Sequence, residues 1–421
     1  MKKIILKQAI IACMIVSGFT NCTREGEQLD GVARAEETTM KLNISLQEPT
    51  TRAPQDQNAT DNEVKVSTID IFIFDANTRK IENRISLNAQ EIDENPTKDA
   101  FTTTTEIRTT TGPKLVAAGI NLPNDFPEVI MSADLQKAWD VSSVALNSAN
   151  GLVMFSTRFQ TPTLVTRNDA DYATRNSIDI PVERAVAKIA VQDGGYTATL
   201  PSGTISNVSF AIRNSNTRLF PMQVVDNGII KDPNWAKDYT YSPSDFKHFN
   251  DYASINDKTN TDKRSWNTKY APENTAEIPL EKTSTYASIR VKFTPTRYTN
   301  GQGKEKVNLN STDFWVVMYD DVVYYFDDKV EAQTFAAARG ATVSEQYKDG
   351  HAYYNAFINV KNGCNVLRNS FYNVKISLII PPGSPTPEEE NPDDKVKEAT
   401  DIKVSIDLEA WDYQEDAYPL S

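Results

Sequence analysis

Two short stretches near opposite ends of this 421-residue chain alternate apolar and polar residues with a period of two. In the first, residues 39–47, the apolar positions are Met40, Leu42, Ile44 and Leu46. In the second, residues 401–411, they are Ile402, Val404, Ile406, Leu408 and Ala410, with Trp411 directly after. This period predicts a β-strand with one buried face at each end of the chain.

The two predicted strands differ in how they are joined to the rest of the chain. The first is followed by Thr51-Arg52-Ala53 and then by the polar run 54–63. An Arg in this setting predicts a protease cleavage point, whose cutting would release residues 39–47. The second follows the Pro-rich acidic segment 381–394, which we expect to act as an extended spacer. One terminal strand is therefore interpreted as removable and the other as its replacement, as in a subunit of a polymer. The alternative is that both are permanent edge strands.

Between these ends the pattern predicts an all-β fold. Short stretches rich in β-branched and aromatic residues recur about every ten residues, separated by turn signals, which favours β-sandwiches. One helix is expected over residues 127–145, where apolar residues have helical spacing. The strand-like run 178–191 is broken by Pro181, which is disfavoured inside a central strand. A domain boundary is therefore predicted near residue 184.

The first 22 residues have the character of an export signal. A basic start precedes the apolar run 10–19, which is too short to span a bilayer. The run leads to Cys22, and the segment resembles a bacterial lipoprotein signal, in which the Cys carries acyl chains. A plain secretory signal is the alternative. The expected organisation is a signal at 1–22, a tether with the removable strand at 23–52, a β-sandwich at 53–184, a second β-sandwich at 185–380, and a tether with the replacing strand at 381–421.

Composition excludes several kinds of function. The net charge of −13 argues against nucleic acid and anionic membrane surfaces as partners. Three Cys do not make a disulfide scaffold, and Cys364 is expected to be a buried bystander. His248 and His351 lie far apart in sequence, and the paired Asp residues at 320–321 and 327–328 are interpreted as solvated. No nucleophile, phosphate-binding or dinucleotide motif occurs, so neither a cofactor nor a catalytic residue is predicted.

The order of motifs along the whole chain resembles that of the type V pilins, or fimbrillins, and most of all their stalk subunits. These are protease-matured fimbrial subunits of certain Gram-negative anaerobes. The matching motifs are the lipobox-like Cys22, the strand before Thr51-Arg52-Ala53, Ile69-Asp-Ile-Phe-Ile-Phe-Asp75, residues 151–156, residues 182–189, residues 270–275, Tyr353-Tyr354, residues 367–376 and the last strand ending in Ala410-Trp411.

The resemblance implies a fold and a way of assembly. The fold would be two transthyretin-like β-sandwiches in tandem with a minor helical insertion. The precursor, lipidated at Cys22, would reach the outer membrane, and an Arg-specific protease would cut between Arg52 and Ala53. The strand Ile402–Trp411 of a neighbouring copy would then fill the opened groove. Partners would be further copies, accessory fimbrial subunits and a surface receptor of unspecified nature, in an adhesive cell-surface fimbrium.

Two other functions stay open at this point. One is a tip or surface adhesin lipoprotein that does not polymerise through its own carboxy terminus. The other, more distant, is a secreted glycan-active enzyme, because carboxylates are numerous although no pair stands out.

Overall fold

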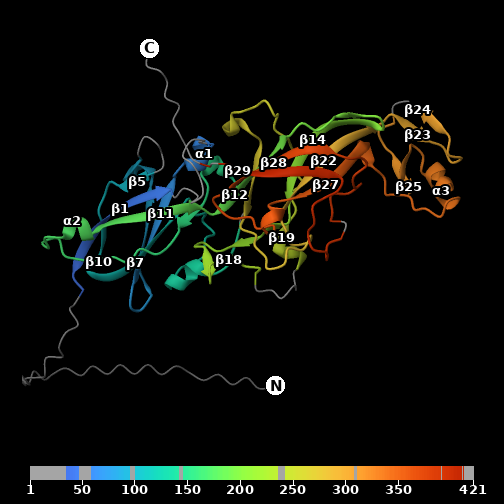
Figure 1. Ribbon diagram of the computed structural model, residues 1–421. Coiled ribbons are helices and arrows are strands. Elements are labelled where there is room, and N and C mark those ends of the chain that lie inside the picture. Colours follow the sequence, from blue (N-terminus) through green and yellow to red (C-terminus); the bar gives the residue numbers. More distant parts are fainter. Residues whose placement is uncertain are drawn as a thin grey trace, which may run out of the picture. The chain divides into compact units, whose positions relative to one another are not determined.

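The computed structural model describes residues 35–46, 58–94, 100–141, 146–235, 242–307, 311–389, 391–409 and 411 (Figure 1). The described residues from Glu36 onward belong to one compact unit. Within the described ranges, no helix is both long and apolar enough to cross a membrane.

Ten strands form the sheet of the amino-terminal half. Their main spatial order is β3 (Ile81–Asn88), β2 (Thr68–Asp75), β7 (Gly112–Ile120), β9 (Met154–Ser156), β11 (Ser177–Arg184), β1 (Glu37–Leu46), β5 (Ala100–Thr103) and β4 (Ile92–Glu94). Two further strands attach to this path, β6 (Ile107–Thr110) to β1 and β10 (Thr163–Leu164) to β7. Figure 1 shows β1, in blue, beside β11, in green. The strand predicted over 39–47 is thus an inner strand of its sheet.

The amino-terminal sheet folds over itself around one apolar core. Side chains from strands far apart in the spatial order meet there, including Leu42 of β1, Ile71 of β2, Val116 of β7 and Ile180 of β11. A second apolar cluster covers the opposite face of β2 and β7, where the ring of Phe126 packs edge-on against Trp139 with centroids 5.1 Å apart. β-branched and aromatic residues favour this pleated, buried setting.

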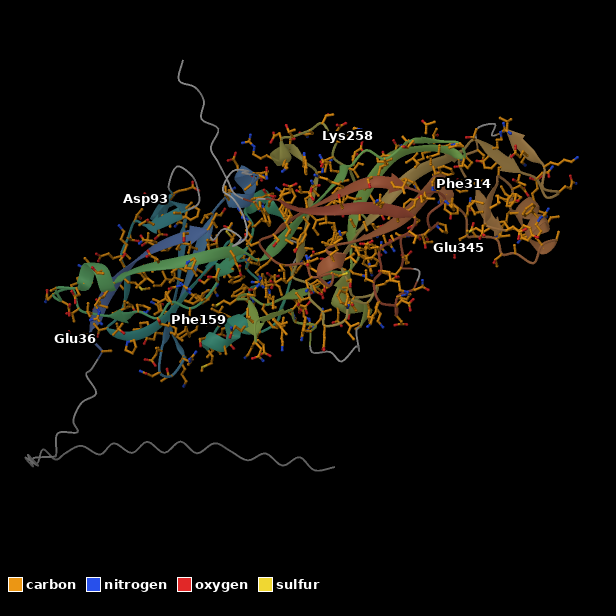
Figure 2. The ribbon with its side chains drawn as sticks, in the orientation of Figure 1. Glu36, Asp93, Phe159, Lys258, Phe314 and Glu345 are labelled. Atoms are coloured by element: carbon orange, nitrogen blue, oxygen red, sulfur yellow. The ribbon has the colours of Figure 1, made fainter. Side chains whose placement is uncertain are left out.

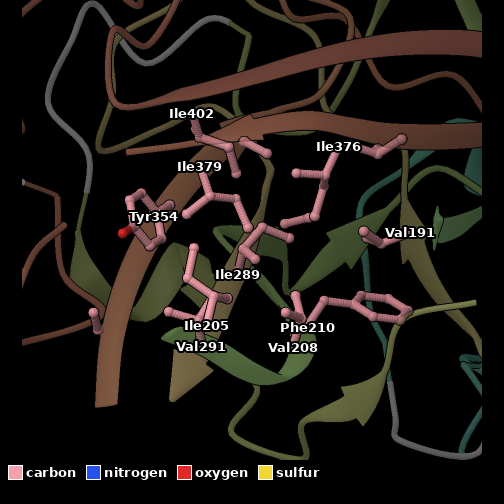
Figure 3. Packing of buried hydrophobic residues seen from close by; sticks show 14 of the residues in the cluster. Val191, Ile205, Val208, Phe210, Ile289, Val291, Tyr354, Ile376, Ile379 and Ile402 are labelled. Atoms are coloured by element: carbon pink, nitrogen blue, oxygen red, sulfur yellow. The ribbon is translucent and has the colours of Figure 1, made fainter. Parts of the chain in front are cut away.

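The carboxy-terminal half is a two-layer sandwich. One layer has the order β21 (Thr268–Pro272), β12 (Val186–Asp193), β28 (Phe371–Ile379) and β29 (Ile402–Glu409). The other has the order β13 (Thr199–Leu200), β14 (Gly203–Arg213), β22 (Tyr286–Pro295) and β27 (His351–Phe357), with β20 (Ala253–Ser254) paired to β14. Figure 3 shows the core between the layers, where Val191 and Ile376 of one layer face Ile289 and Phe210 of the other. The all-β fold predicted from the strand pattern is confirmed.

The chain passes from one half to the other at Ala185. Strand β11 ends at Arg184 in the amino-terminal sheet, and β12 begins at Val186 in the carboxy-terminal sandwich. This change of sheet lies one residue beyond the boundary predicted near residue 184. Pro181 sits in β11, where it lies opposite Ser45 of β1.

The helix predicted over 127–145 is wrong for the residues described there. Ser132–Gln136 form a 3-10 turn, and β8 (Trp139–Asp140) pairs with β16 (Arg218–Leu219). The helical spacing is overridden by packing, because Leu135 and Trp139 join the aromatic cluster on the outer face of β2 and β7. Among the helices that the sequence pattern missed is α3 (Lys329–Ala337), which follows its N-cap residue Asp328.

The remaining elements are short. They are α1 (Asp61–Val64), α2 (Tyr172–Arg175), and the strand pairs β15 (Ser215–Asn216) with β19 (Phe246–Lys247), β17 (Val224–Asp226) with β18 (Ile229–Lys231), β23 (Arg297–Thr299) with β24 (Glu305–Val307), and β25 (Trp315–Tyr319) with β26 (Val322–Phe326). Near the last pair, Phe314 (labelled in Figure 2) stacks on Tyr347 with centroids 4.5 Å apart.

Candidate functional site

Strand β1 is built into its sheet on both edges. It runs parallel to β11, with Ile44 opposite Ile180, and antiparallel to β5, where Ile44 lies opposite Phe101. The side chains of Met40, Leu42 and Ile44 are at most 1% exposed, and that of Leu46 is half-buried. Taking β1 away would therefore uncover an apolar floor between two strand edges.

Polar contacts fix the register of β1. The backbone N–H of Lys41 donates to the carbonyl of Asn176 (2.8 Å), and the Asn176 side-chain amide donates back to the carbonyl of Thr39 (2.7 Å). On the exposed face, the amide of Asn43 donates to the carboxylate of Asp179 at 2.9 Å. A strand that replaced β1 would meet these same groups.

The carboxy-terminal strand is folded onto its own chain. β29 pairs antiparallel with β28 and is the edge strand of its layer. Ile402 is buried beside Ile379 in the core (Figure 3), while Val404 and Ile406 are half-buried and pack against the same core. Leu408 is 46% exposed. Within the single chain, the alternating face of β29 therefore packs on the core of the carboxy-terminal sandwich.

The segment predicted to be a free spacer is docked as well. Its Ser384 exchanges two backbone hydrogen bonds with Tyr353 of β27, at 2.8 and 2.9 Å. The hydroxyl of Tyr347 donates to the carbonyl of Gly383 at 2.7 Å, and Arg213 forms an ion pair with Glu388 at 3.1 Å. Proline lacks an N–H but not a carbonyl, so a Pro-rich segment can still be held by donors from a neighbouring strand.

Trp411 is held in a cage of aromatic and cationic side chains. Its side chain is fully buried, and its ring stacks on Tyr270 with centroids 6.2 Å apart and planes 14° from parallel. The guanidinium of Arg184 lies 4.6 Å from the indole centroid and the ammonium of Lys188 lies 5.8 Å from it. Cations over an indole face are attracted by its negative potential. We call Arg184, Lys188 and Tyr270 the tryptophan cage.

A buried ion pair supports the cage from the amino-terminal side. The Lys188 ammonium lies 2.9 Å from the carboxylate of Glu63, and both side chains are at most 1% exposed. The Tyr270 hydroxyl donates to the same carboxylate at 2.6 Å. Burial opposes ionisation of Glu63, but the Lys188 charge and the hydrogen bonds from Tyr270 and Thr60 hold its pKa below the ordinary value. The network ties α1, which follows the predicted cleavage point, to β12 and β21.

A second polar network lies around Arg368. Its guanidinium is 2.9 Å from the Glu273 carboxylate and donates to the carbonyls of Phe220 and Pro221 at 2.7 and 2.8 Å. Glu183 of β11 lies 3.9 Å from it. Burial raises the pKa of Glu183 to about 7, with Arg368 opposing the rise and Glu273 adding to it.

Three sequence motifs therefore meet where β11 passes into β12. The cage and, together with Glu63 of α1, both polar networks are built from residues 182–189, 270–275 and 367–376. The motifs were evident in the sequence, but the contacts between them were not. One available signal was the charge of Lys188 inside the apolar run Val186–Val191, because a buried charge requires a partner.

Several predicted sites lie outside the described residues or have ordinary roles. The described ranges do not include Cys22, Arg52, Ala53 or Ala410, so the roles of these residues stay predictions. Within those ranges, no three His, Cys, Asp or Glu side chains are grouped as a metal site would need. Of the paired Asp residues, Asp327 forms an ion pair with Lys306 at 2.6 Å and Asp328 caps α3. Cys364 is buried with a free thiol.

Three solved structures are similar to this chain, and the first of them supports the fold. A structure of a candidate cell adhesion protein from Parabacteroides distasonis matches with a TM-score of 0.53 at 12% identity, covering 89% of this chain and 98% of that one. A fimbrilin from Porphyromonas gingivalis matches with a TM-score of 0.49 at 14% identity, covering 90% and 99%. A tip fimbrial protein from the same species matches with a TM-score of 0.41 at 11% identity, covering 89% and 100%. No curated protein matches the chain.

Two family models identify the protein family to which this chain belongs. The model of the major fimbrial subunit protein (FimA) matches residues 38–193, from β1 to the end of β12. The model of the major fimbrial subunit protein type IV, fimbrillin, carboxy-terminal part, matches residues 345–417. The chain belongs to the fimbrillin family of fimbrial subunits, as the order of its motifs indicated. It is thus a structural component of a cell-surface fimbrium.

Proposed function

We propose that this chain is a stalk subunit that joins its neighbours by exchange of a β-strand. In this proposal the precursor is anchored in the outer membrane by acyl chains on Cys22. An Arg-specific protease then cuts between Arg52 and Ala53, and β1 leaves its sheet. The strand β29 of a neighbouring copy fills the vacated place. Repeated head to tail, such a joint makes a filament, because it does not close a ring.

The observation that carries the proposal is the position of β1 between two partner strands. Because β1 pairs with β11 on one edge and with β5 and β6 on the other, its removal would leave unpaired backbone groups on both sides of an apolar floor. Such a groove is a template for adding a strand. Reburying three large side chains in the places of Met40, Leu42 and Ile44 would contribute about 5–9 kcal/mol, as an upper estimate.

The chemistry of β29 matches that of β1. With Ile402 in the place of Met40, the apolar residues Val404, Ile406 and Leu408 take the places of Leu42, Ile44 and Leu46. The outward residues would be Lys403 for Lys41, Ser405 for Asn43 and Asp407 for Ser45. Ser405 would then stand beside Asp179, which it could serve as a hydrogen-bond donor in place of Asn43.

The position of the chain in purified fibres tests this proposal against an adhesin at the tip. A stalk subunit should be labelled by antibody at regular intervals along the whole fibre, and its amino-terminal residue should be Ala53. Label confined to fibre ends, or to cells without fibres, would favour the tip or surface adhesin. An amino terminus at Cys22 in assembled fibres would contradict cleavage after Arg52.

A further inference from the structure

We propose that the tryptophan cage is an exchanged docking site, which holds the chain's own Trp411 before assembly and the Trp411 of a neighbouring subunit afterwards. This inference rests on the proposed strand exchange and adds a second contact to it. The cage residues Arg184, Lys188 and Tyr270 are all described, and the side chain they hold is already a Trp. The occupant is therefore a second copy of the same residue.

The cage lies at the end of the groove that β1 occupies. Strand β1 runs in the same direction as β11, and its last residue, Leu46, lies opposite Val182. Two residues later, β11 reaches Arg184, which is part of the cage. Leu46 also packs against the apolar cluster that contains Trp411. A strand leaving the groove at this end therefore arrives at the cage.

The spacing from Leu408 to Trp411 matches the distance from the place of Leu46 to the cage. When Leu408 takes the place of Leu46, Trp411 follows three residues later, about 10 Å further along an extended strand. Continuing the parallel register of β1 and β11, that position falls opposite Ala185, next to Arg184. The incoming Trp411 therefore reaches the level of the cage. Because side chains alternate between faces along a strand, its indole enters the cage only if the incoming chain turns out of the extended ladder between Leu408 and Trp411.

The cage must change occupant if β29 is donated. Trp411 lies two residues beyond the end of β29, so the strand cannot pair with another subunit while its Trp411 stays behind in the cage. Its departure would leave Arg184 and Lys188 beside an empty apolar space lined by Val186, Phe371 and Trp266. Cavities lined by apolar side chains are unfavourable, and the two cations would lose their favourable contact with an indole ring. An incoming Trp411 from the next subunit removes both penalties.

Peptide binding to the full chain tests this exchange. The acceptor is the chain cleaved after Arg52 and carrying Trp411→Ala, so that its own residue cannot occupy the cage. Peptides 401–412 with and without Trp411→Ala are titrated against it. We expect the Trp peptide to bind at least tenfold more tightly, because it alone buries an indole between a cation and an aromatic ring.

A double-variant cycle assigns that difference to the cage. Adding Arg184→Met to the acceptor should shrink the preference for the Trp peptide to less than about threefold. A Leu408→Ala peptide is the matched control, because its loss of affinity should be the same with and without Arg184→Met. The exchanged cage would be contradicted if the Trp and Ala peptides bound with equal affinity, or if Arg184→Met left the preference for the Trp peptide unchanged. Either result would leave the proposed strand exchange intact. If neither peptide binds, strand exchange itself fails.

Discussion

Single charged side chains hold the two halves of the subunit together where β11 passes into β12. Lys188 and Glu63 are both buried, so each depends on the other for its charge to be tolerated. Arg368 likewise joins Glu273 to Glu183 and to two backbone carbonyls. Changes at these positions should therefore affect stability more than changes at surface ion pairs, which contribute little.

Lys188→Met should lower the free energy of unfolding by about 3–5 kcal/mol at neutral pH, because Glu63 keeps a buried charge without its cation. The measurement is denaturant unfolding of the full chain. The double variant Lys188→Met/Glu63→Leu is the control and should recover part of the loss. A single variant as stable as the unchanged chain would contradict a paired buried charge.

Glu183→Gln should change how stability depends on pH. The pKa of Glu183 is raised to about 7 in the folded chain from an ordinary value of 4.5, so its contribution to stability is complete below pH 4.5 and is lost as the pH rises through 7. The variant lacks this loss. Its stability relative to the unchanged chain should therefore rise by about 1–3 kcal/mol between pH 4.5 and 8. Thermal unfolding at several pH values measures this, and parallel pH profiles for both chains would refute it.

At the scale of elements, the strands at the two ends illustrate what local pattern can and cannot predict. The alternation in β1 and β29 fixes which residues face a core, and both strands form where the sequence indicates. It does not say which core, because an alternating apolar face carries no information about the sheet that it will join. The helix expected at 127–145 and the spacer expected at 381–394 failed for a related reason: contacts with distant residues, such as Trp139 with Phe126 and Ser384 with Tyr353, outweigh local preference.

The self-docked β29 alters what a substitution in it should do. Ile406→Asp places a carboxylate against the subunit's own core and also against the proposed groove, at a cost of several kcal/mol in either place. We expect a folded chain whose β29 amides exchange hydrogen faster and which no longer adds to a cleaved neighbour. Lys403→Asp, on the exposed face, is the matched control and should keep slow exchange of these amides. Fibres formed normally by Ile406→Asp would show that β29 is not the donor.

At the scale of the whole molecule, the proposed assembly makes cleavage the step after which the chain can accept a strand. As long as β1 fills its place, no neighbour can enter, because β11 and β5 are both already paired with it. Arg52→Ala should therefore yield a folded, monomeric precursor. Size-exclusion chromatography after protease treatment measures this, with the unchanged chain as control. Polymers formed by Arg52→Ala without any cut in residues 47–57 would be inconsistent with a groove opened by proteolysis.

The most direct test of strand exchange is a disulfide between subunits. In the proposed register, Ser405 of one copy takes the place of Asn43 beside Asp179 of the next, whereas within one chain Ser405 is paired with Lys375 of β28. Directly opposed residues on neighbouring strands are close enough for a disulfide. The chain carrying Asp179→Cys and Ser405→Cys, cleaved after Arg52 and oxidised, should give a ladder of disulfide-linked multimers on a denaturing gel. Either single variant, and the uncleaved double variant, should run as monomers. Fibres that form from the cleaved double variant without any such ladder would contradict replacement of β1 by β29 in this register.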